Sequence, residues 1–299
     1  MTGAIKMSLL LACALALLTS AGQLPVPPDG PLYGIGRICN VAYTDSTNPP
    51  QLLDVYLPAD DSSARPMVIY IHSGSWQEGD KAEHPEMYVP LVEAGYVVFS
   101  INYRLTGEAA YPAQIYDCKA AVRWARAHAQ EYGGDPARIA AVGSSAGAHL
   151  AALLGTTGDV KELEGNAGSD GVSSRVQAVV DWFGPTDLTL VQAAEGYDIT
   201  PVAMLLGGEP KERMDMAKLA SPAAFVSADD PPFLIIHGTE DPVVPFVLSQ
   251  VMAGKLSKAG ASVELIPVPG GEHGGFETTE PDLDELMTQV VGFLDGVFD

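Results

Sequence analysis

A short glycine- and serine-rich segment in the middle of the chain constrains the fold more than any other feature. Residues 139–142 form an apolar run typical of a buried strand, and the pattern G-x-S-x-G follows directly at residues 143–147. An Ala/Leu-rich stretch of helical character continues to Leu154. Strand, pattern and helix in this order predict a tight turn with Ser145 at its apex, because small flanking residues let strand and helix pass closely. An ordinary glycine-rich loop is the alternative, which this context disfavours.

Stretches of strand and helix character alternate along the rest of the chain. Such alternation predicts a mostly parallel sheet with helices on both faces, and therefore an α/β fold. Residues 38–57 alternate apolar and polar side chains, which favours an antiparallel hairpin with one solvated face. We expect the other strands at 67–71, 96–101, 138–142, 176–182, 233–237 and 263–268, and helices at 86–94, 112–131, 146–154, 245–259 and 281–297.

The chain divides into a leader, a linker and one domain. Residues 1–21 carry Lys6, an apolar stretch too short to span a bilayer comfortably and small residues before a cleavage point, which together predict a signal peptide. A lipoprotein signal at Cys13 is a weaker alternative. Residues 22–37 are rich in Pro and Gly and are expected to be a linker, which leaves 38–299 as one domain. Within it, 186–230 breaks the alternation and is a candidate cap insertion between the sixth and seventh strands.

Composition excludes several classes of function. The formal net charge of −22 disfavours nucleic acids and anionic membranes as partners, because both attract basic surfaces. No second long apolar segment follows the leader, so no membrane span is expected. No Cys/His group has zinc-ligand spacing, and we expect no catalytic metal. Cys39 and Cys118 would remain after export, and the sequence leaves open whether they form a disulfide. The oligomeric state is equally open.

A serine hydroxyl needs a base and an orienting carboxylate to act as a nucleophile. In folds with this type of turn, the three groups follow one another as serine, acid and histidine. Asp241 follows a buried strand and is our candidate for the acid, with Glu240 as its rival. His273 lies in the glycine-flanked loop after the last strand and is the candidate base. Protonation of this imidazole at acidic pH would then abolish its function.

The segment after the strand at 67–71 is the candidate for stabilising a developing oxyanion. Gly74 and Ser75 follow that strand, and their amides together with the amide of Ala146 are the predicted donors. Serines stand at positions 73 and 75, where glycines are more usual in such a loop. Ser75 is expected to supply its amide, and its hydroxyl is a further candidate donor.

Several motifs in the same order along the chain resemble those of a known family. The sequence is similar to the α/β-hydrolase carboxylesterases, nearest to bacterial feruloyl or acetyl-xylan esterase-like enzymes and close to the hormone-sensitive-lipase-like group. This resemblance implies an eight-stranded, mostly parallel sheet, a Ser145–Asp241–His273 triad and no cofactor. The motifs that carry it are HSGSW (72–76), GDK (79–81), NYRL (102–105), YPAQ (111–114), GSSAGAHLA (143–151), FGPTDL (183–188), HGTED (237–241) and GEH (271–273).

Aromatic residues near the ends of strands are candidate substrate-binding residues. Trp76, Trp182 and Phe183 are expected either to line an acyl or aryl pocket or to pack in the core. Of the other histidines, His149 is expected to pack against the sheet and His237 to support the acid. His84 and His128 are expected on exposed helices.

The sequence thus predicts a secreted or periplasmic serine esterase acting on short acyl or aryl esters, including small molecules and polymer-linked esters of plant polysaccharides. An α/β-hydrolase peptidase and a lipase or polyester hydrolase are alternatives. A non-catalytic binding protein is a third alternative, which the retention of all the candidate groups disfavours.

Overall fold

The computed structural model describes residues 34–45, 51–60, 64–158, 160–191 and 198–299. The predicted signal peptide and most of the predicted linker lie outside the described residues. The last residues of that linker, Gly36 and Arg37, already belong to the first strand. The domain therefore begins slightly earlier than the Pro/Gly composition indicated.

One eight-stranded sheet forms the centre of the domain, in the order β1-β2-β4-β3-β5-β6-β7-β8. β1 and β2 pair antiparallel, and β2 pairs antiparallel with β4, whereas every remaining pairing is parallel. The predicted edge hairpin and mostly parallel sheet are therefore confirmed. The strands are β1 (Gly36–Ala42), β2 (Leu52–Leu57), β3 (Arg65–Ile71), β4 (Val97–Ile101), β5 (Gly134–Ser144), β6 (Ala178–Trp182), β7 (Phe233–Gly238) and β8 (Val263–Val268).

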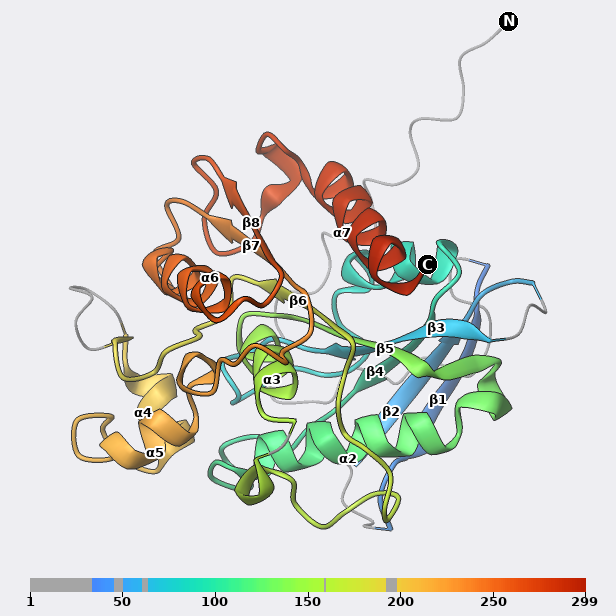
Figure 1. The fold of residues 1–299 in the computed structure, drawn as a ribbon, viewed down its shortest axis with the longest axis horizontal. Helices are drawn as coiled ribbons and strands as arrows, with labels where there is room; N and C mark the ends of the chain where they lie inside the picture. The colour runs from blue at the N-terminus through green and yellow to red at the C-terminus, as the bar shows by residue number, and fades with distance from the viewer. Residues whose placement is uncertain (1–33, 46–50, 61–63, 159, 192–197) are drawn as a thin grey trace, which may run out of the picture.

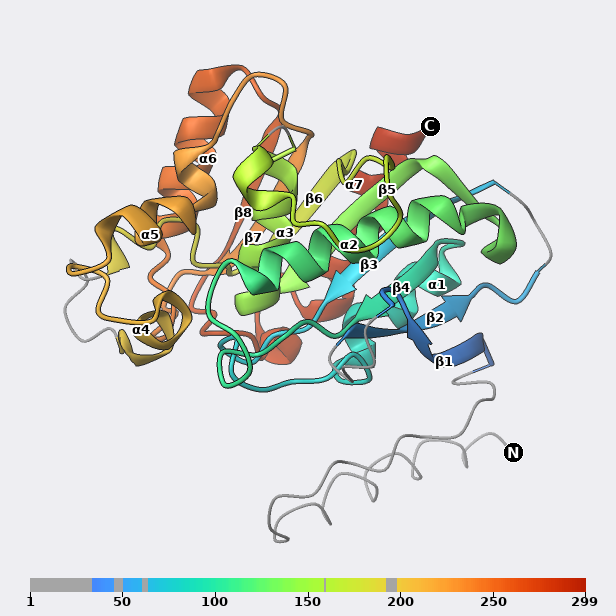
Figure 2. The ribbon, with the colours of Figure 1, turned by 90° about the horizontal axis from the view of Figure 1, so that it is seen from below.

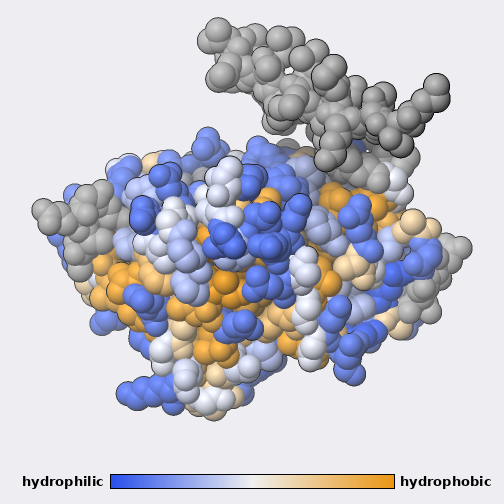
Figure 3. Space-filling model, turned by 90° about the horizontal axis from the view of Figure 1, so that it is seen from above, coloured by the Kyte–Doolittle hydropathy of each residue, from blue (hydrophilic) through white to orange (hydrophobic). Residues whose placement is uncertain are grey.

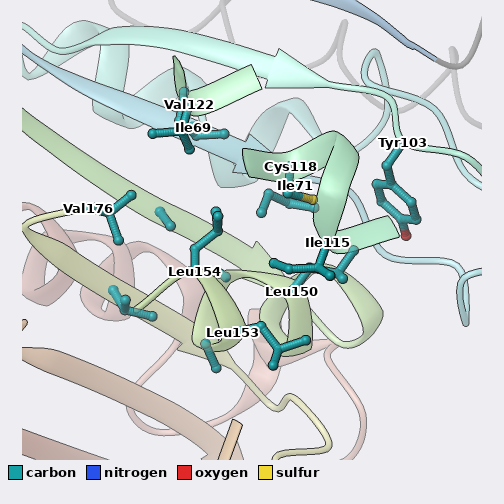
Figure 4. Packing of buried hydrophobic residues seen from close by; sticks show 14 of the residues in the cluster. Ile69, Ile71, Tyr103, Ile115, Cys118, Val122, Leu150, Leu153, Leu154 and Val176 are labelled. Atoms are coloured by element: carbon teal, nitrogen blue, oxygen red, sulfur yellow. The ribbon is translucent and has the colours of Figure 1, made fainter. Parts of the chain in front are cut away.

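The central strands are apolar on both faces, because helices cover both sides of the sheet. In β3, Ile69 and Ile71 belong to one hydrophobic cluster, while Val68 and Tyr70 belong to the other. This division follows from the alternation of side chains along a strand. Figure 4 shows the first cluster, in which Ile69 and Ile71 lie close to side chains of α2 and α3.

The helices form two layers (Figure 1), with α2 and α3 on one side of the sheet and α7 on the other. α6 packs on the α2–α3 side and α1 on the α7 side, as the membership of their buried residues in the two clusters indicates. The helices are α1 (Val89–Glu93), α2 (Ala113–Ala127), α3 (Ala146–Thr156), α4 (Thr200–Leu206), α5 (Met214–Leu219), α6 (Val247–Ala259) and α7 (Leu283–Phe298).

Several elements differ from their predicted bounds by a few residues, and two of these differences have identifiable reasons. The helix expected at 86–94 is split into a 3₁₀ turn, η2 (Pro85–Met87), and the short α1. Pro90 explains the split, because its ring would clash with the carbonyl of Glu86 in a continuous helix. β5 begins at Gly134 rather than at residue 138. The sequence did not predict these first residues as strand, because they are polar and show no apolar pattern.

The predicted insertion between β6 and β7 holds α4 and α5, which lie beside α6 in Figures 1 and 2, at the end of the molecule away from β1. Hydrogen bonds tie its described part to the domain. The hydroxyl of Tyr111 donates to the carbonyl of Leu219 over 2.9 Å, and the Lys255 ammonium donates to that of Ala223 over 2.9 Å. The described part of the insertion is therefore anchored to the segment before α2 and to α6.

Cys118 has a free thiol, so no disulfide joins it to Cys39. Cys39 lies on the edge strand β1, whereas Cys118 is buried in α2 within the core. On the α7 side, the surface mixes apolar patches (orange) with polar side chains (blue), as Figure 3 shows. Within the described ranges, no helix has both the length and the apolar composition of a membrane span.

Candidate active site

Ser145 lies at the apex of the turn between β5 and α3. Its backbone has φ 52° and ψ −117°, a conformation that non-glycine residues rarely adopt. A Cβ on Gly147 would approach the carbonyl oxygen of Ile71 to 2.0 Å, and one on Gly143 would approach the backbone of Gly147 to 2.5 Å. The two glycines of the motif are therefore required by close backbone contacts, and the predicted strand–turn–helix arrangement is present.

A continuous chain of hydrogen bonds joins the three candidate catalytic residues. The Ser145 Oγ lies 2.8 Å from Nε2 of His273, and Nδ1 of His273 lies 2.7 Å from Oδ2 of Asp241. Because the carboxylate can only accept, Nδ1 carries the proton and Nε2 is left to accept one from the hydroxyl. This is the geometry that a serine nucleophile and its base require. The rival acid, Glu240, is exposed to solvent.

Asp241 is held as a buried, ionised carboxylate. Its Oδ1 accepts hydrogen bonds from the amides of Val243 and Val244, at 2.7 and 2.8 Å. Nε2 of His237 lies 3.2 Å from Oδ2, and the Nδ1 of that histidine lies 2.7 Å from the Ser249 hydroxyl. Burial raises the pKa of the Asp241 carboxyl, but the hydrogen bonds from the two histidines and the Val244 amide outweigh it. The net pKa is well below its ordinary value.

The loop that follows β3 is folded tightly next to Ser145. Gly74 has φ 105°, and a Cβ there would lie 2.1 Å from the carbonyl oxygen of Glu78. Ser75 and Trp76 also have positive φ, at 54° and 60°. Gly74 and Ser75 line a cavity together with Ser145, and Ser75 and Ala146 line a second one. Ala146 is the first residue of α3, so no carbonyl of its own helix can accept a hydrogen bond from its amide. The predicted amides are thus next to the candidate nucleophile.

His149 connects this loop to the insertion. The indole Nε1 of Trp76 donates to Nδ1 of His149 over 3.2 Å, and Nε2 of His149 donates to the carbonyl of Ala220 over 2.6 Å. The two bonds define the tautomer, and burial lowers the pKa of His149 to about 4, so the ring is neutral at pH 7. The prediction that His149 simply packs against the sheet missed this bridge.

The three aromatic residues that were candidates for substrate binding have different surroundings. Phe183 borders one cavity, and its ring meets that of His273 edge to face at 4.7 Å. Trp76 borders the second cavity. Trp182 is completely buried in the core, although it also forms part of the lining of the first cavity.

The predicted site did not include a pair of polar side chains that border the first cavity. His84 and Glu86 line the first cavity, with Nδ1 of His84 2.9 Å from a carboxylate oxygen of Glu86. His84 is exposed, as expected, but it precedes η2 in a left-handed conformation rather than lying on a helix. The only local signal was the His-Pro-Glu sequence, which does not specify that the two side chains face a cavity. His128 is partly buried at the C-terminal end of α2.

Across the described ranges, no group of three or more His, Cys, Asp or Glu side chains is arranged to hold a metal ion. The titratable groups around Ser145 instead pair with one another, as His273 does with Asp241.

The sheet order, the elbow serine and its hydrogen-bonded histidine define an α/β hydrolase. The family model described as BD-FAE matches residues 53–256, which is more than half of the chain. The chain therefore belongs to the BD-FAE family of α/β-hydrolase carboxylesterases, and the predicted family resemblance and fold class are confirmed.

Similar proteins agree with this assignment. A truncated carbohydrate esterase from gut microbiota superposes with a TM-score of 0.80 and 37% identity, covering 87% of this chain and 95% of that one. An acetyl ester-xyloside bifunctional hydrolase from Caldicellulosiruptor lactoaceticus gives a TM-score of 0.72 and 26% identity, covering 86% and 96%. Esterase LipQ of Mycobacterium tuberculosis is 32% identical over 251 residues, or 82% of this chain. The chain spans only 59% of the length of LipQ.

Proposed function

We propose that this chain is a secreted serine carboxylesterase that hydrolyses short acyl or aryl esters, with acetyl and feruloyl esters of plant polysaccharides as its substrate class. The observation that carries the proposal is the hydrogen-bond chain from Asp241 through His273 to Ser145. A carboxylate, a neutral imidazole and a hydroxyl in this order are the groups that acyl transfer requires.

The geometry supports a two-step reaction. Ser145 Oγ attacks the ester carbonyl carbon while Nε2 of His273 takes the hydroxyl proton, and Asp241 stabilises the resulting imidazolium. The amides of Ala146, Ser75 and Gly74 would receive the oxyanion. His273 then returns the proton to the departing alcohol, which leaves an acyl-enzyme. Water, deprotonated by the same histidine, releases the carboxylic acid and restores Ser145.

The substrate class is supported by the family and by the names of similar proteins. A carbohydrate esterase and an acetyl ester-xyloside hydrolase are among the similar structures, and both match nearly the whole length of this chain's domain. The acidic net charge of −22 is compatible with a neutral polymer as substrate and disfavours an anionic one.

Hydrolysis of p-nitrophenyl esters from acetate to decanoate, together with methyl ferulate, tests the proposal. Ser145→Ala should lower kcat by about 10³-fold or more and abolish labelling by a fluorophosphonate probe. Ser257→Ala is the matched control, since Ser257 is exposed on α6. A folded wild type that neither labels nor hydrolyses any ester would overturn the proposal in favour of a binding protein. Cleavage of peptide anilides alone would favour the peptidase alternative.

Activity should also fall with acidification. An imidazolium has no free lone pair, so a protonated His273 could not accept the Ser145 proton. We expect kcat/KM for p-nitrophenyl acetate to decrease from pH 8 to pH 5. A flat profile over this range would exclude His273 as the base.

Secretion is proposed from the leader at residues 1–21, which ends in small residues suited to cleavage after Ala21. Intact-mass analysis of the protein exported from a bacterial host should give an N-terminus at Gly22. Retention of the uncleaved chain in the cytoplasm would contradict the proposal.

A further inference from the structure

Two cavities border Ser145, the candidate nucleophile. The histidine-side cavity, of about 330 Å³, is bordered by His273 and by the segment 84–87. The proline-side cavity, of about 290 Å³, is bordered by Ala146, Pro185 and Pro201 and does not include His273. Ser75, Ser145 and Val243 border both.

The chemistry of ester cleavage assigns one half of the substrate to each cavity. The alcohol oxygen must take a proton from Nε2 of His273 as its bond to carbon breaks, so the alcohol has to extend on the side of that ring. The oxyanion would point toward the amides of Gly74, Ser75 and Ala146, and the acyl chain takes the remaining direction. The alcohol half therefore belongs in the histidine-side cavity and the acyl half in the proline-side cavity.

Backbone strain indicates which further residues serve this site. Seven non-glycine residues have positive φ among those the structure describes, and five of them border these two cavities: Ser75, Trp76, His84, Ser145 and Phe183. Such conformations are energetically costly and tend to persist where they position functional groups. Ser75 and Ser145 take part in the hydrolytic mechanism, and of the three that do not, Trp76, His84 and Phe183, only His84 has an ionisable side chain.

The side chain of His84 forms a charge-assisted pair on the wall of the histidine-side cavity. The hydrogen bond between His84 and Glu86 raises the pKa of the imidazole and lowers that of the carboxyl, which favours the charged forms of both. Each side chain is about half exposed, at 47% and 48%, so donor and acceptor atoms remain accessible. Glu277 also borders this cavity, while Met87 and Phe276 provide apolar surface.

We infer that the His84–Glu86 pair recognises the hydroxyl groups of a neutral sugar that forms the alcohol half of the ester. This inference rests on the proposed function and specifies the alcohol that this site accepts. Carboxylates and an imidazolium hydrogen-bond hydroxyls strongly, and the apolar side chains complement the less polar faces of a sugar ring. The two carboxylates, Glu86 and Glu277, disfavour an anionic alcohol such as a uronic acid.

The test compares acetates of three alcohols: methyl xyloside, a methyl glucuronoside and 1-butanol. The wild type should prefer the neutral sugar to both others in kcat/KM. In Glu86→Gln and His84→Asn the ratio of xyloside acetate to butyl acetate should fall about tenfold, mainly through KM, as expected for a lost charge-assisted hydrogen bond. Asparagine is chosen because it tolerates the left-handed backbone of His84. Glu93→Gln, exposed on α1, is the matched control and should leave the ratio unchanged.

A separate measurement tests the assignment of the acyl half to the proline-side cavity. Pro201→Ala should raise the butyrate-to-acetate ratio for a single alcohol and leave the alcohol ratio unchanged. Equal alcohol ratios in wild type, Glu86→Gln and His84→Asn would overturn the inference while ester hydrolysis itself persists. A wild type that hydrolyses none of the acetates would overturn the proposed function instead.

Discussion

The turn at Ser145 requires a neighbouring glycine, because a Cβ atom would not fit at that position. A Cβ at position 147 would meet the backbone of Ile71 at 2.0 Å, and backbone atoms cannot move aside as a flexible side chain could. The approach of α3 to β3 is therefore possible only with glycine. The position of the nucleophile relative to the loop after β3 follows from that approach.

We expect Gly147→Ala to destabilise the protein by about 3 kcal/mol or more and to lower kcat strongly, because the elbow has to shift. Urea denaturation and p-nitrophenyl acetate hydrolysis provide the two measurements. Gly254→Ala on α6 is the matched control. Apart from the neighbouring residues and backbone of its own helix, no atom lies within 4 Å of a Cβ at that position, so alanine should stabilise the helix by about 1 kcal/mol. Equal stabilities of the two variants would contradict the close-contact argument.

Ser75 lies where its hydroxyl as well as its amide can face the reacting carbonyl, since it borders both cavities. Ser75→Ala retains the amide and should lower kcat several-fold, well below the roughly 10²–10³-fold cost of losing a whole oxyanion donor. Steady-state kinetics with p-nitrophenyl acetate measure the effect. An unchanged kcat would exclude the hydroxyl from the oxyanion site.

At the scale of elements, a buried ion pair supports the segment that continues from the oxyanion loop. The ammonium of Lys81 lies 3.2 Å from Oδ1 of Asp54 on β2, and both side chains are at least 97% buried. The side chain of Asn102 adds two bonds, accepting from the amide of Lys81 and donating to Asp80. The GDK and NYRL motifs therefore fasten this loop to the end of β4.

Lys81→Met should destabilise the protein by about 3–5 kcal/mol, because it leaves the carboxylate of Asp54 buried without its cation. Thermal and urea unfolding measure the change. Lys211→Met is the matched control, since Lys211 pairs with Glu209 at the surface, and its effect on stability should be small. If the double variant Asp54→Asn/Lys81→Met were as unstable as the sum of the two single variants, the two groups would not be coupled.

At the scale of the whole molecule, buried histidines make stability depend on pH. Burial lowers the pKa of His72 and of His149 to about 4, below the ordinary value of 6.5. Between these values the unfolded chain binds protons that the folded protein does not, so stability falls as pH decreases from 6.5 to 4. Asp181 acts in the opposite direction, because burial raises its pKa to about 6 and the folded state holds the extra proton.

The net loss between pH 7 and pH 4 should therefore resemble that of one buried histidine, on the order of 3 kcal/mol. Urea unfolding across this range measures it. His149→Gln should flatten the dependence and Asp181→Asn should steepen it, since each removes one of the opposing groups. Parallel pH dependences for wild type and both variants would contradict this account.

Much of the fold and site could be predicted because the signals are local. The parallel sheet was predicted from β-branched runs, which are patterns of neighbouring residues. The groups around Ser145 were predicted from the G-x-S-x-G turn and from the order of serine, acid and histidine along the chain. Helix ends were less predictable where a proline or a polar strand start interrupted the pattern, as at Pro90 and Gly134.

The sequence by itself thus determined the class of fold and the order of the candidate catalytic groups, because strand and helix periodicities and turn glycines are properties of short segments. Only the tertiary structure decided that Asp241 rather than Glu240 meets His273, and that His84 and Glu86 face the same cavity as Ser145. Ser145 and His273 are separated by 128 residues, and the order of the strands brings them within a hydrogen bond. Contacts of this kind depend on how the strands assemble, which no local pattern encodes.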